Sequence, residues 1–190
     1  MPLNLPNLLT WLRIILIPLI VGVYYLPQTW LSIPGQNIAA TAIFVFAAVT
    51  DWLDGYLARK LDQTSAFGAF LDPVADKLMV VGALIVLLQL DRVESAVALI
   101  IIGREIAISA LREWMAKIGK SKSVAVAFIG KVKTASQMIA IPLLLYHDRL
   151  WGTLDCQVYG TVLINVAAVL TVISMLYYLR QALPHVLDAG

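Results

Sequence analysis

Six long apolar segments constrain the fold of this chain more than any other feature of its sequence. An α-helix needs about 20 apolar residues to cross a bilayer, and each segment approaches that length when polar residues near its ends are tolerated. The segments cover roughly residues 7–25, 38–61, 69–90, 95–115, 124–146 and 158–179. We therefore predict an all-α, polytopic integral membrane protein with six transmembrane helices.

Composition agrees with this prediction. Hydrophobic residues make up 61% of the 190 residues and charged residues 14%, against about 25% charged in ordinary soluble chains. The net charge of +2 gives no argument for nucleic acid binding. Cys156 is the single cysteine, which excludes an intramolecular disulfide and a thiolate metal site. The sequence shows no flexible linker, internal repeat or cleavable signal, so we predict one membrane domain over residues 1–190 whose first apolar segment is retained.

The distribution of lysine and arginine predicts the orientation. Basic residues concentrate between the second and third segments and around the loop between the fourth and fifth, whereas the opposite loops hold only Arg92 and Arg149. Basic loops stay on the cytoplasmic side of a membrane. Both termini and both basic loops should therefore be cytoplasmic.

Four carboxylates lie in one short stretch of this apolar chain: Asp51, Asp54, Asp72 and Asp76. The first two are three residues apart and the last two four apart, so on helices each pair shares one face. Ionised groups at membrane depth are costly and usually functional. Two facing acidic helices would form an oxygen-rich site for hard divalent cations. The competing interpretation is a charge-paired helical hairpin at the interface.

The start of the third helix has two interpretations. Asp72 and Pro73 fit an N-cap followed by the first helical residue. Alternatively, the helix begins near Ser65 and Pro73 bends it, which keeps Gly68, Asp72 and Asp76 on one stripe. We favour the longer helix, because it places a small residue beside the acidic face.

The acidic stretch resembles the complete signature of the class-I CDP-alcohol phosphotransferase family. The matching positions are Asp51, Asp54, Gly55, Ala58, Arg59, Gly68, Asp72 and Asp76. The early run PNLLTWLR, with Pro6, Asn7, Thr10 and Arg13, is similar to the family's nucleotide-side element on the first helix. Taken alone, Asn7 is equally a plausible N-cap. Members of this family displace CMP from a CDP-linked donor with the hydroxyl of an acceptor alcohol.

The resemblance implies a role for each of these residues. The metal ligands would be Asp51, Asp54, Asp72 and Asp76, holding two Mg²⁺ ions or their substitute Mn²⁺. Asp76 would also be the general base that takes the proton of the acceptor. The residues that bind the nucleotide donor would be Asn7, Thr10, Gly55, Arg59, Ser65 and Gly68.

A second polar set lies in the other half of the chain: Arg104, Arg112, Lys131 and Lys133. Snorkelling side chains and Arg–Glu pairing are the simple explanation. We favour an anion pocket, because two successive helices bring cations to the depth of the acidic site and a phosphate on the acceptor needs such a pocket. The runs GREIAISALREWMA and GKVKTASQM resemble bacterial members that use CDP-diacylglycerol and sn-glycerol 3-phosphate.

That resemblance also implies a homodimer in the bacterial inner membrane, with its active site facing the cytoplasm. Three alternatives remain at this point. The acceptor could be that of a phosphatidylinositol-phosphate, phosphatidylserine or cardiolipin synthase of the same family. Membrane prenyltransferases also hold magnesium diphosphate on Asp-rich helices, but without the Gly-x2-Ala-Arg that follows Asp54 here. A divalent-cation transporter would carry acids near mid-membrane on several helices.

Overall fold

The computed structural model describes residues 5–60, 66–119, 128–150 and 152–187. Within these ranges the side chains of residues 5–7, 54–59, 66–67, 69, 128 and 185–187 are not described. The described part of the chain forms six helices and two very short strands. They are α1 (Leu5–Val23), α2 (Ile33–Lys60), α3 (Ala66–Gln89), α4 (Ser95–Lys117), α5 (Phe128–Tyr146), β1 (Arg149–Leu150), β2 (Leu154–Asp155) and α6 (Cys156–Leu187).

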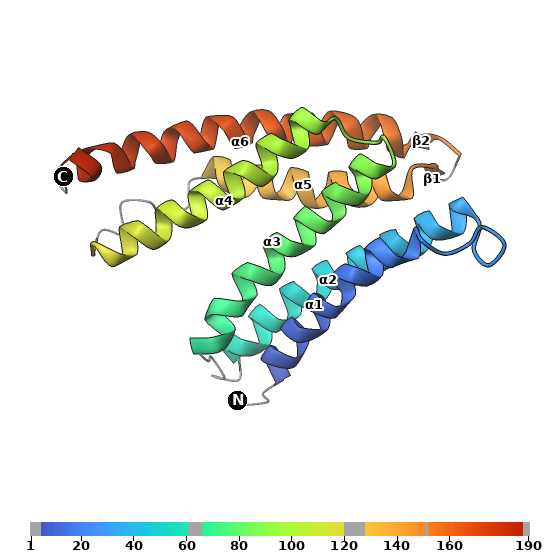
Figure 1. The fold of residues 1–190 in the computed structure, drawn as a ribbon, viewed down its shortest axis with the longest axis horizontal. Helices are drawn as coiled ribbons and strands as arrows, with labels where there is room; N and C mark the ends of the chain where they lie inside the picture. Colours follow the sequence, from blue (N-terminus) through green and yellow to red (C-terminus); the bar gives the residue numbers. More distant parts are fainter. Residues whose placement is uncertain (1–4, 61–65, 120–127, 151, 188–190) are drawn as a thin grey trace.

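The six helices form two groups of three (Figure 1). In the first group α1 packs against α2 and α3, and in the second α6 packs against α5 and α4. Contacts of α5 with α2 and of α3 with α4 and α5 join the groups. The groups lie close together near the α3–α4 turn and diverge toward the ends where α2 finishes and α3 begins (Figure 1).

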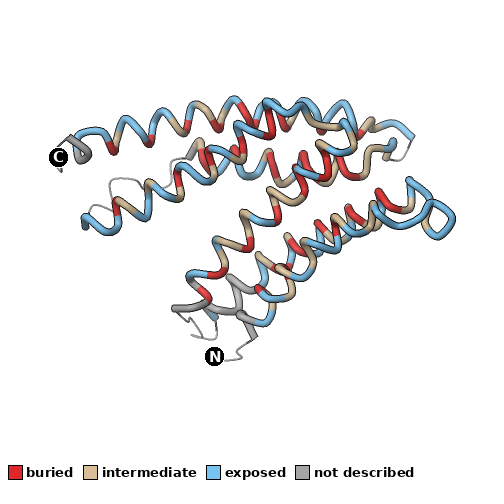
Figure 2. The backbone as a smooth tube through the Cα atoms, in the orientation of Figure 1, coloured by how far each residue is buried: buried red, intermediate tan, exposed pale blue. Residues whose placement is uncertain are grey.

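Small residues allow the helices to approach closely. Ala40, Ala47, Ala75, Ala83 and Ala140 are all completely buried, and buried positions line the inward faces of the helices (Figure 2). A Cβ atom on Gly160 of α6 would lie 2.7 Å from the Leu144 side chain of α5, so no larger residue fits there without a shift. Packing through alanine and glycine is typical of helices in a membrane, where burial against lipid gives no hydrophobic driving force.

The outward faces of the helices are apolar. Leu99, Val162, Val169 and Leu176 all expose more than half of their surface. Among the described residues, two helical stretches are long and apolar enough to cross a membrane, Ile33–Leu53 and Cys156–Pro184, and Leu8–Val23 is a shorter apolar helix. The prediction of a mostly helical protein with apolar candidate spans is confirmed, whereas the count of six spans stays a prediction.

Two details of the predicted secondary structure are corrected. The turn before the last helix contains a small antiparallel hairpin, in which Arg149 pairs with Asp155 and Leu150 with Leu154. The last helix, predicted over 158–179, extends from Cys156 to Leu187. Its polar C-terminal turns lie beyond the apolar segment on which the prediction relied.

Helix α3 begins at Ala66 and continues through Pro73. The longer-helix interpretation is therefore confirmed, and the alternative with Asp72 as N-cap is wrong. A proline inside a helix loses one backbone hydrogen bond. Because the helix continues through Pro73, the residues Gly68, Asp72 and Asp76 lie on one helical face.

A polar clamp holds the two groups together at the end where they converge. Arg92, in the α3–α4 turn, donates from Nη1 to the carbonyl oxygens of Leu144 (3.1 Å) and Leu145 (2.8 Å) near the end of α5. Its Nη2 donates to Asn37 Oδ1 of α2 at 2.9 Å, and the Tyr24 hydroxyl donates to the same oxygen at 3.3 Å. The clamp satisfies carbonyls that the end of α5 leaves without helical partners. Because the clamp lies at the convergent end, a site can lie between the two helix groups at the opposite, divergent end.

Candidate active site

Three of the predicted carboxylates meet around one buried arginine. Arg13 of α1 has no exposed side-chain surface, and its Nη1 pairs with Asp51 of α2 and, at 2.7 Å, with Asp76 of α3. Its Nη2 lies 3.6 Å from Asp72. Thr10, three residues earlier on α1, donates from Oγ1 to Asp72 Oδ1 at 2.6 Å. We call these five residues the acidic cluster.

Local helical geometry explains half of this arrangement. Thr10 and Arg13 are three residues apart, and Asp72 and Asp76 four apart, so each pair shares one helical face. The packing of α1 against both α2 and α3 then brings these faces together. The sequence placed Arg13 in a nucleotide-side element, whereas the structure places its guanidinium among the carboxylates. An arginine within an apolar helix needs an anionic partner when it is buried, so Arg13 itself was a signal in the sequence for contact with the carboxylates.

The acidic cluster suits divalent cations in its donor type and its charge. The side chains of Asp51, Asp72 and Asp76 are 37%, 45% and 49% exposed, so their oxygens reach solvent. Three carboxylates and one guanidinium leave a net charge of −2. Carboxylate oxygens are the ligands that Mg²⁺ and Mn²⁺ prefer, and the three acids already converge on one cationic group. Among the described residues, no group of three or more acidic, histidine or cysteine side chains is already arranged to hold a metal ion. The guanidinium of Arg13 lies among the three acids.

The structure describes the other residues predicted on the donor side to different extents. Gly68 is buried on α3, one turn before Asp72. Asn7, Asp54, Gly55 and Arg59 belong to α1 and α2, but their side chains lie outside the described part of the structure, and Ser65 lies outside the described residues altogether.

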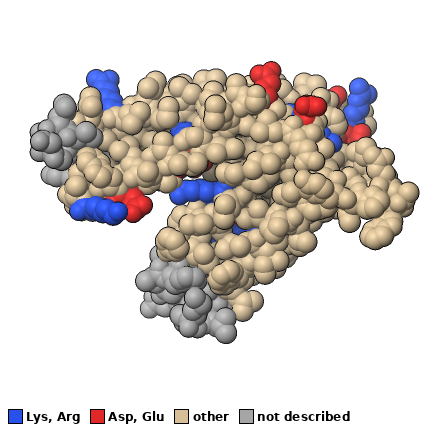
Figure 3. Space-filling view, viewed as in Figure 1, with Lys and Arg blue, Asp and Glu red and all other residues tan. Residues whose placement is uncertain are grey.

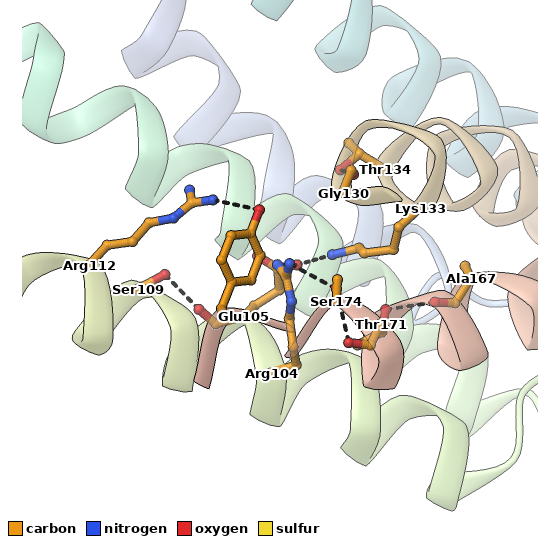
Figure 4. Close-up of polar contacts among 11 residues, drawn as sticks. Arg104, Glu105, Ser109, Arg112, Gly130, Lys133, Thr134, Ala167, Thr171 and Ser174 are labelled. Atoms are coloured by element: carbon orange, nitrogen blue, oxygen red, sulfur yellow. Dashed lines mark hydrogen bonds and ion pairs between the residues drawn. The ribbon is translucent and has the colours of Figure 1, made fainter. Parts of the chain in front are cut away.

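A second cluster of charge lies where α4, α5 and α6 meet (Figure 4). Lys133 of α5, only 2% exposed, forms an ion pair with Glu105 of α4. Arg104 Nη1 donates to Glu105 Oε1 at 3.2 Å, and Arg104 Nη2 donates to Ser174 Oγ of α6 at 3.2 Å. Arg104 itself is 8% exposed. These contacts connect residues 28 and 70 positions apart in the chain.

Tyr178 of α6 connects these residues to Arg112. We call Arg104, Glu105, Arg112 and Lys133 the basic cluster. The guanidinium carbons of Arg104 and Arg112 lie 5.6 and 5.3 Å from the centre of its ring, within the range of a cation–π contact. Arg112 Nη2 also donates to the Tyr178 hydroxyl at 3.4 Å. The predicted cations Arg104, Arg112 and Lys133 are thus brought together. The fourth, Lys131, is exposed two residues before Lys133, on a different side of α5, and makes none of these contacts.

A cavity of about 290 Å³ connects the acidic cluster with the basic cluster. Asp51 and Asp76 line it on one side, and Glu105 and Lys133 on the other. The remaining lining residues are Pro73, Lys77, Met79, Val80, Thr134, Gln137 and Met138. Figure 3 shows a recess between the diverging helix groups with basic side chains at its edge. One small molecule in this cavity can therefore touch a carboxylate and a buried ammonium group at the same time.

Comparison with known proteins identifies the family. The model of the CDP-alcohol phosphatidyltransferase family matches residues 3–173. The chain belongs to this family. It is 50% identical to the CDP-diacylglycerol–glycerol-3-phosphate 3-phosphatidyltransferases of Escherichia coli (strain K12) and of Shigella flexneri serotype 5b (strain 8401). Each alignment extends over 190 residues, with 99% of this chain and 100% of the relative.

Membership of this family confirms the resemblance predicted from the stretch between Asp51 and Asp76. It also decides against the prenyltransferase and cation-transporter interpretations. The residues of the site that the sequence did not single out for a role include Glu105, Ser174 and Tyr178. Among them, Glu105 had a signal, since it directly follows Arg104 within an apolar segment.

Proposed function

We propose that this protein transfers the phosphatidyl group of CDP-diacylglycerol to sn-glycerol 3-phosphate, releasing CMP and forming phosphatidylglycerophosphate. This reaction is the first committed step toward phosphatidylglycerol and cardiolipin. Full-length identity of 50% to relatives named for this activity supports the assignment. In the structure, the assignment is supported by one cavity that both Asp76 and Lys133 line.

On the donor side, Asp51, Asp54, Asp72 and Asp76 would hold two Mg²⁺ ions, or Mn²⁺ in their place. Such ions polarise a diphosphate and stabilise the charge of the leaving group. The donor itself would bind along Asn7, Thr10, Gly55, Arg59, Ser65 and Gly68. The net charge of −2 in the acidic cluster supports cation binding there.

On the acceptor side, the phosphate of glycerol 3-phosphate would bind to Lys133, Arg104 and Arg112, with Lys131 at the entrance. Asp76 then takes the proton of the primary hydroxyl. The deprotonated oxygen attacks the lipid-side phosphorus. The bond from that phosphorus to the CMP oxygen breaks, and CMP leaves. Charge-assisted hydrogen bonds to a doubly charged phosphate hold the acceptor in place for this attack.

We further propose that the six helices span a bacterial inner membrane, with both termini and the site on the cytoplasmic side, and that two copies form a homodimer. The apolar outward faces and the two clear candidate spans support membrane insertion. The basic residue Lys60 ends α2 at the divergent end, beyond Asp51 on the same helix, as expected for a cytoplasmic site. A reporter fused after Gly190 should report a cytoplasmic C-terminus.

The test is an assay of the purified protein in detergent with CDP-diacylglycerol and Mg²⁺. Glycerol 3-phosphate, inositol phosphate, serine and phosphatidylglycerol are supplied separately, and CMP release is measured for each. CMP should form with glycerol 3-phosphate and stop when EDTA removes the metal. Release with another acceptor and none with glycerol 3-phosphate would assign the chain to a different branch of the family.

A further inference from the structure

Gln137 is a buried residue in the wall of the cavity. It lies on α5, four residues after Lys133, and is 3% exposed. Its Nε2 atom has no hydrogen-bond partner among the described residues, although the side chain lines the cavity. Buried amide groups are nearly always hydrogen-bonded, since an unpaired donor is costly. The missing partner is therefore expected inside the cavity.

The neighbouring hydroxyl groups on α5 are already occupied. Thr134, which also lines the cavity, donates from Oγ1 to the Gly130 carbonyl oxygen at 3.0 Å. Ser136 donates to the Val132 carbonyl oxygen at 3.0 Å. Each hydroxyl has one hydrogen to donate, so both are used within the helix. Of these three neighbours, only Gln137 retains a donor for a ligand.

The surroundings of Gln137 match one part of the proposed acceptor. Four helical residues rise about 6 Å, so Gln137 lies one turn deeper in the cavity than Lys133. Met79, Val80 and Met138 form apolar wall nearby, which leaves the amide as a polar group on an apolar surface. Glycerol 3-phosphate carries its phosphate on C3, the reacting hydroxyl on C1 and a further hydroxyl on C2. With the phosphate at Lys133 and the C1 hydroxyl at Asp76, the C2 hydroxyl has no partner assigned.

We propose that the side-chain amide of Gln137 hydrogen-bonds the C2 hydroxyl of the acceptor and so selects a glycerol phosphate over phosphorylated alcohols without that group. A hydroxyl both donates and accepts, which suits an amide that carries a group of each kind. A site built to hydrogen-bond a hydroxyl rejects an analogue that lacks it, because its own polar group is left unpaired. The proposal rests on the proposed function and adds a specificity-determining residue to it.

The experiment combines a variant with an altered substrate. kcat/KM is measured for sn-glycerol 3-phosphate and for 3-hydroxypropyl phosphate, which lacks only the C2 hydroxyl, in the wild type and in Gln137→Leu. We expect the wild type to prefer glycerol 3-phosphate by roughly 10- to 100-fold. Gln137→Leu should lose about the same factor with glycerol 3-phosphate and stay within about threefold with the analogue. The preference between the two acceptors should therefore collapse.

Ser136→Ala is the matched control, since it removes a polar group from the next position of α5 without touching the cavity. It should keep the wild-type preference. Gln137→Met, an unbranched replacement of similar length, repeats the test if Gln137→Leu does not fold. Purified holoenzyme in detergent with Mg²⁺ is used throughout.

Two results would overturn the inference while the proposed function stands. An equal loss with both acceptors would make Gln137 a packing residue. A wild type that does not discriminate between the acceptors would mean that water alone satisfies the amide. Failure of the proposed function looks different, because CMP would then form with serine or inositol phosphate and with neither glycerol-type acceptor.

Discussion

The acidic and basic clusters each combine several like charges with one opposite charge, but they bury different members of that set. In the acidic cluster the central group is a fully buried guanidinium, and the surrounding carboxylates are 37–49% exposed. In the basic cluster two of the three cations are buried, Lys133 at 2% and Arg104 at 8% exposed, whereas Arg112 is exposed and the anion Glu105 is 20% exposed. The acidic cluster thus exposes the groups that would bind a ligand and buries their counter-charge. The basic cluster buries two of its three binding groups, Arg104 and Lys133, and leaves their counter-charge nearer to solvent.

This difference indicates how each cluster would exchange its internal partner for a substrate. An uncompensated buried charge costs several kcal/mol, so each cluster carries an opposite charge of its own. Arg104, Arg112 and Lys133 with Glu105 leave a net charge of +2, which balances a doubly charged phosphate. The acidic cluster leaves −2, which favours divalent cations. Arg13 therefore compensates part of the charge of the acidic cluster and Glu105 part of the charge of the basic cluster, and a bound ligand would compensate the rest.

The largest expected effect concerns Asp76, which lies in both the acidic cluster and the shared cavity. Asp76→Asn should lower CMP release about 10³-fold, since general-base catalysis contributes roughly 10²–10⁴. Nucleotide binding should remain measurable. Asp91→Asn, in the exposed α3–α4 turn at the opposite end, is the control and should keep full activity. An active Asp76→Asn enzyme would refute the assignment of the base.

Arg13→Met tests the counter-charge of the acidic cluster. The variant leaves three carboxylates to repel one another without a cation between them, so thermal unfolding in EDTA should occur at a lower temperature than in the wild type. Because these carboxylates are 37–49% exposed, the loss should be smaller than the roughly 3–5 kcal/mol of a fully buried pair. Mg²⁺ should stabilise the variant more than it stabilises the wild type, because the metal replaces the missing positive charge. Arg149→Met, at a side chain that is 71% exposed, is the control. Equal metal-induced shifts in variant and wild type would show that Arg13 does not compensate these carboxylates.

Lys133→Ala and Lys131→Ala, compared side by side, test which cation the acceptor phosphate uses. A hydrogen bond to a charged group is worth about 1.5–3 kcal/mol, so Lys133→Ala should raise the KM for glycerol 3-phosphate roughly 10- to 100-fold. The KM for CDP-diacylglycerol should change little. Lys131→Ala, at an exposed position on the same helix, should change either KM less than about threefold. The reverse order would move the phosphate out of the basic cluster.

Tyr178→Phe should have the smallest effect. It removes the 3.4 Å hydrogen bond from Arg112 and keeps the ring beside both guanidinium groups. At 3.4 Å this hydrogen bond is long, so its loss should cost about 0.5–1 kcal/mol, or less than about fivefold in the KM for glycerol 3-phosphate. Tyr178→Leu also removes the ring and should cost more. If the two variants behave alike, the ring contacts contribute nothing to the placement of the arginines.

Much of the fold and part of the site followed from local sequence patterns. Apolar segments predicted the helices, although the limits of α6 were missed because its last turns are polar. The stripe of Gly68, Asp72 and Asp76 predicted that α3 continues through Pro73. Arg104 and Arg112 are eight residues apart, two four-residue steps, which is the spacing of residues on a common helical face. Lys131 shows the limit of such reasoning, because a basic residue two positions from Lys133 points to a different side of α5.

By itself, the sequence determined the helical architecture, the two acidic helix faces and the family, because each depends on spacings of a few residues or on a contiguous motif. The tertiary structure decided which charges meet. Arg13 reaches Asp76 across 63 residues, and Lys133 reaches Glu105 across 28. These contacts depend on how α1 packs on α3 and how α4 and α5 both pack on α6, and no local periodicity encodes that packing. The cavity between the clusters, with Gln137 in its wall, exists for the same reason.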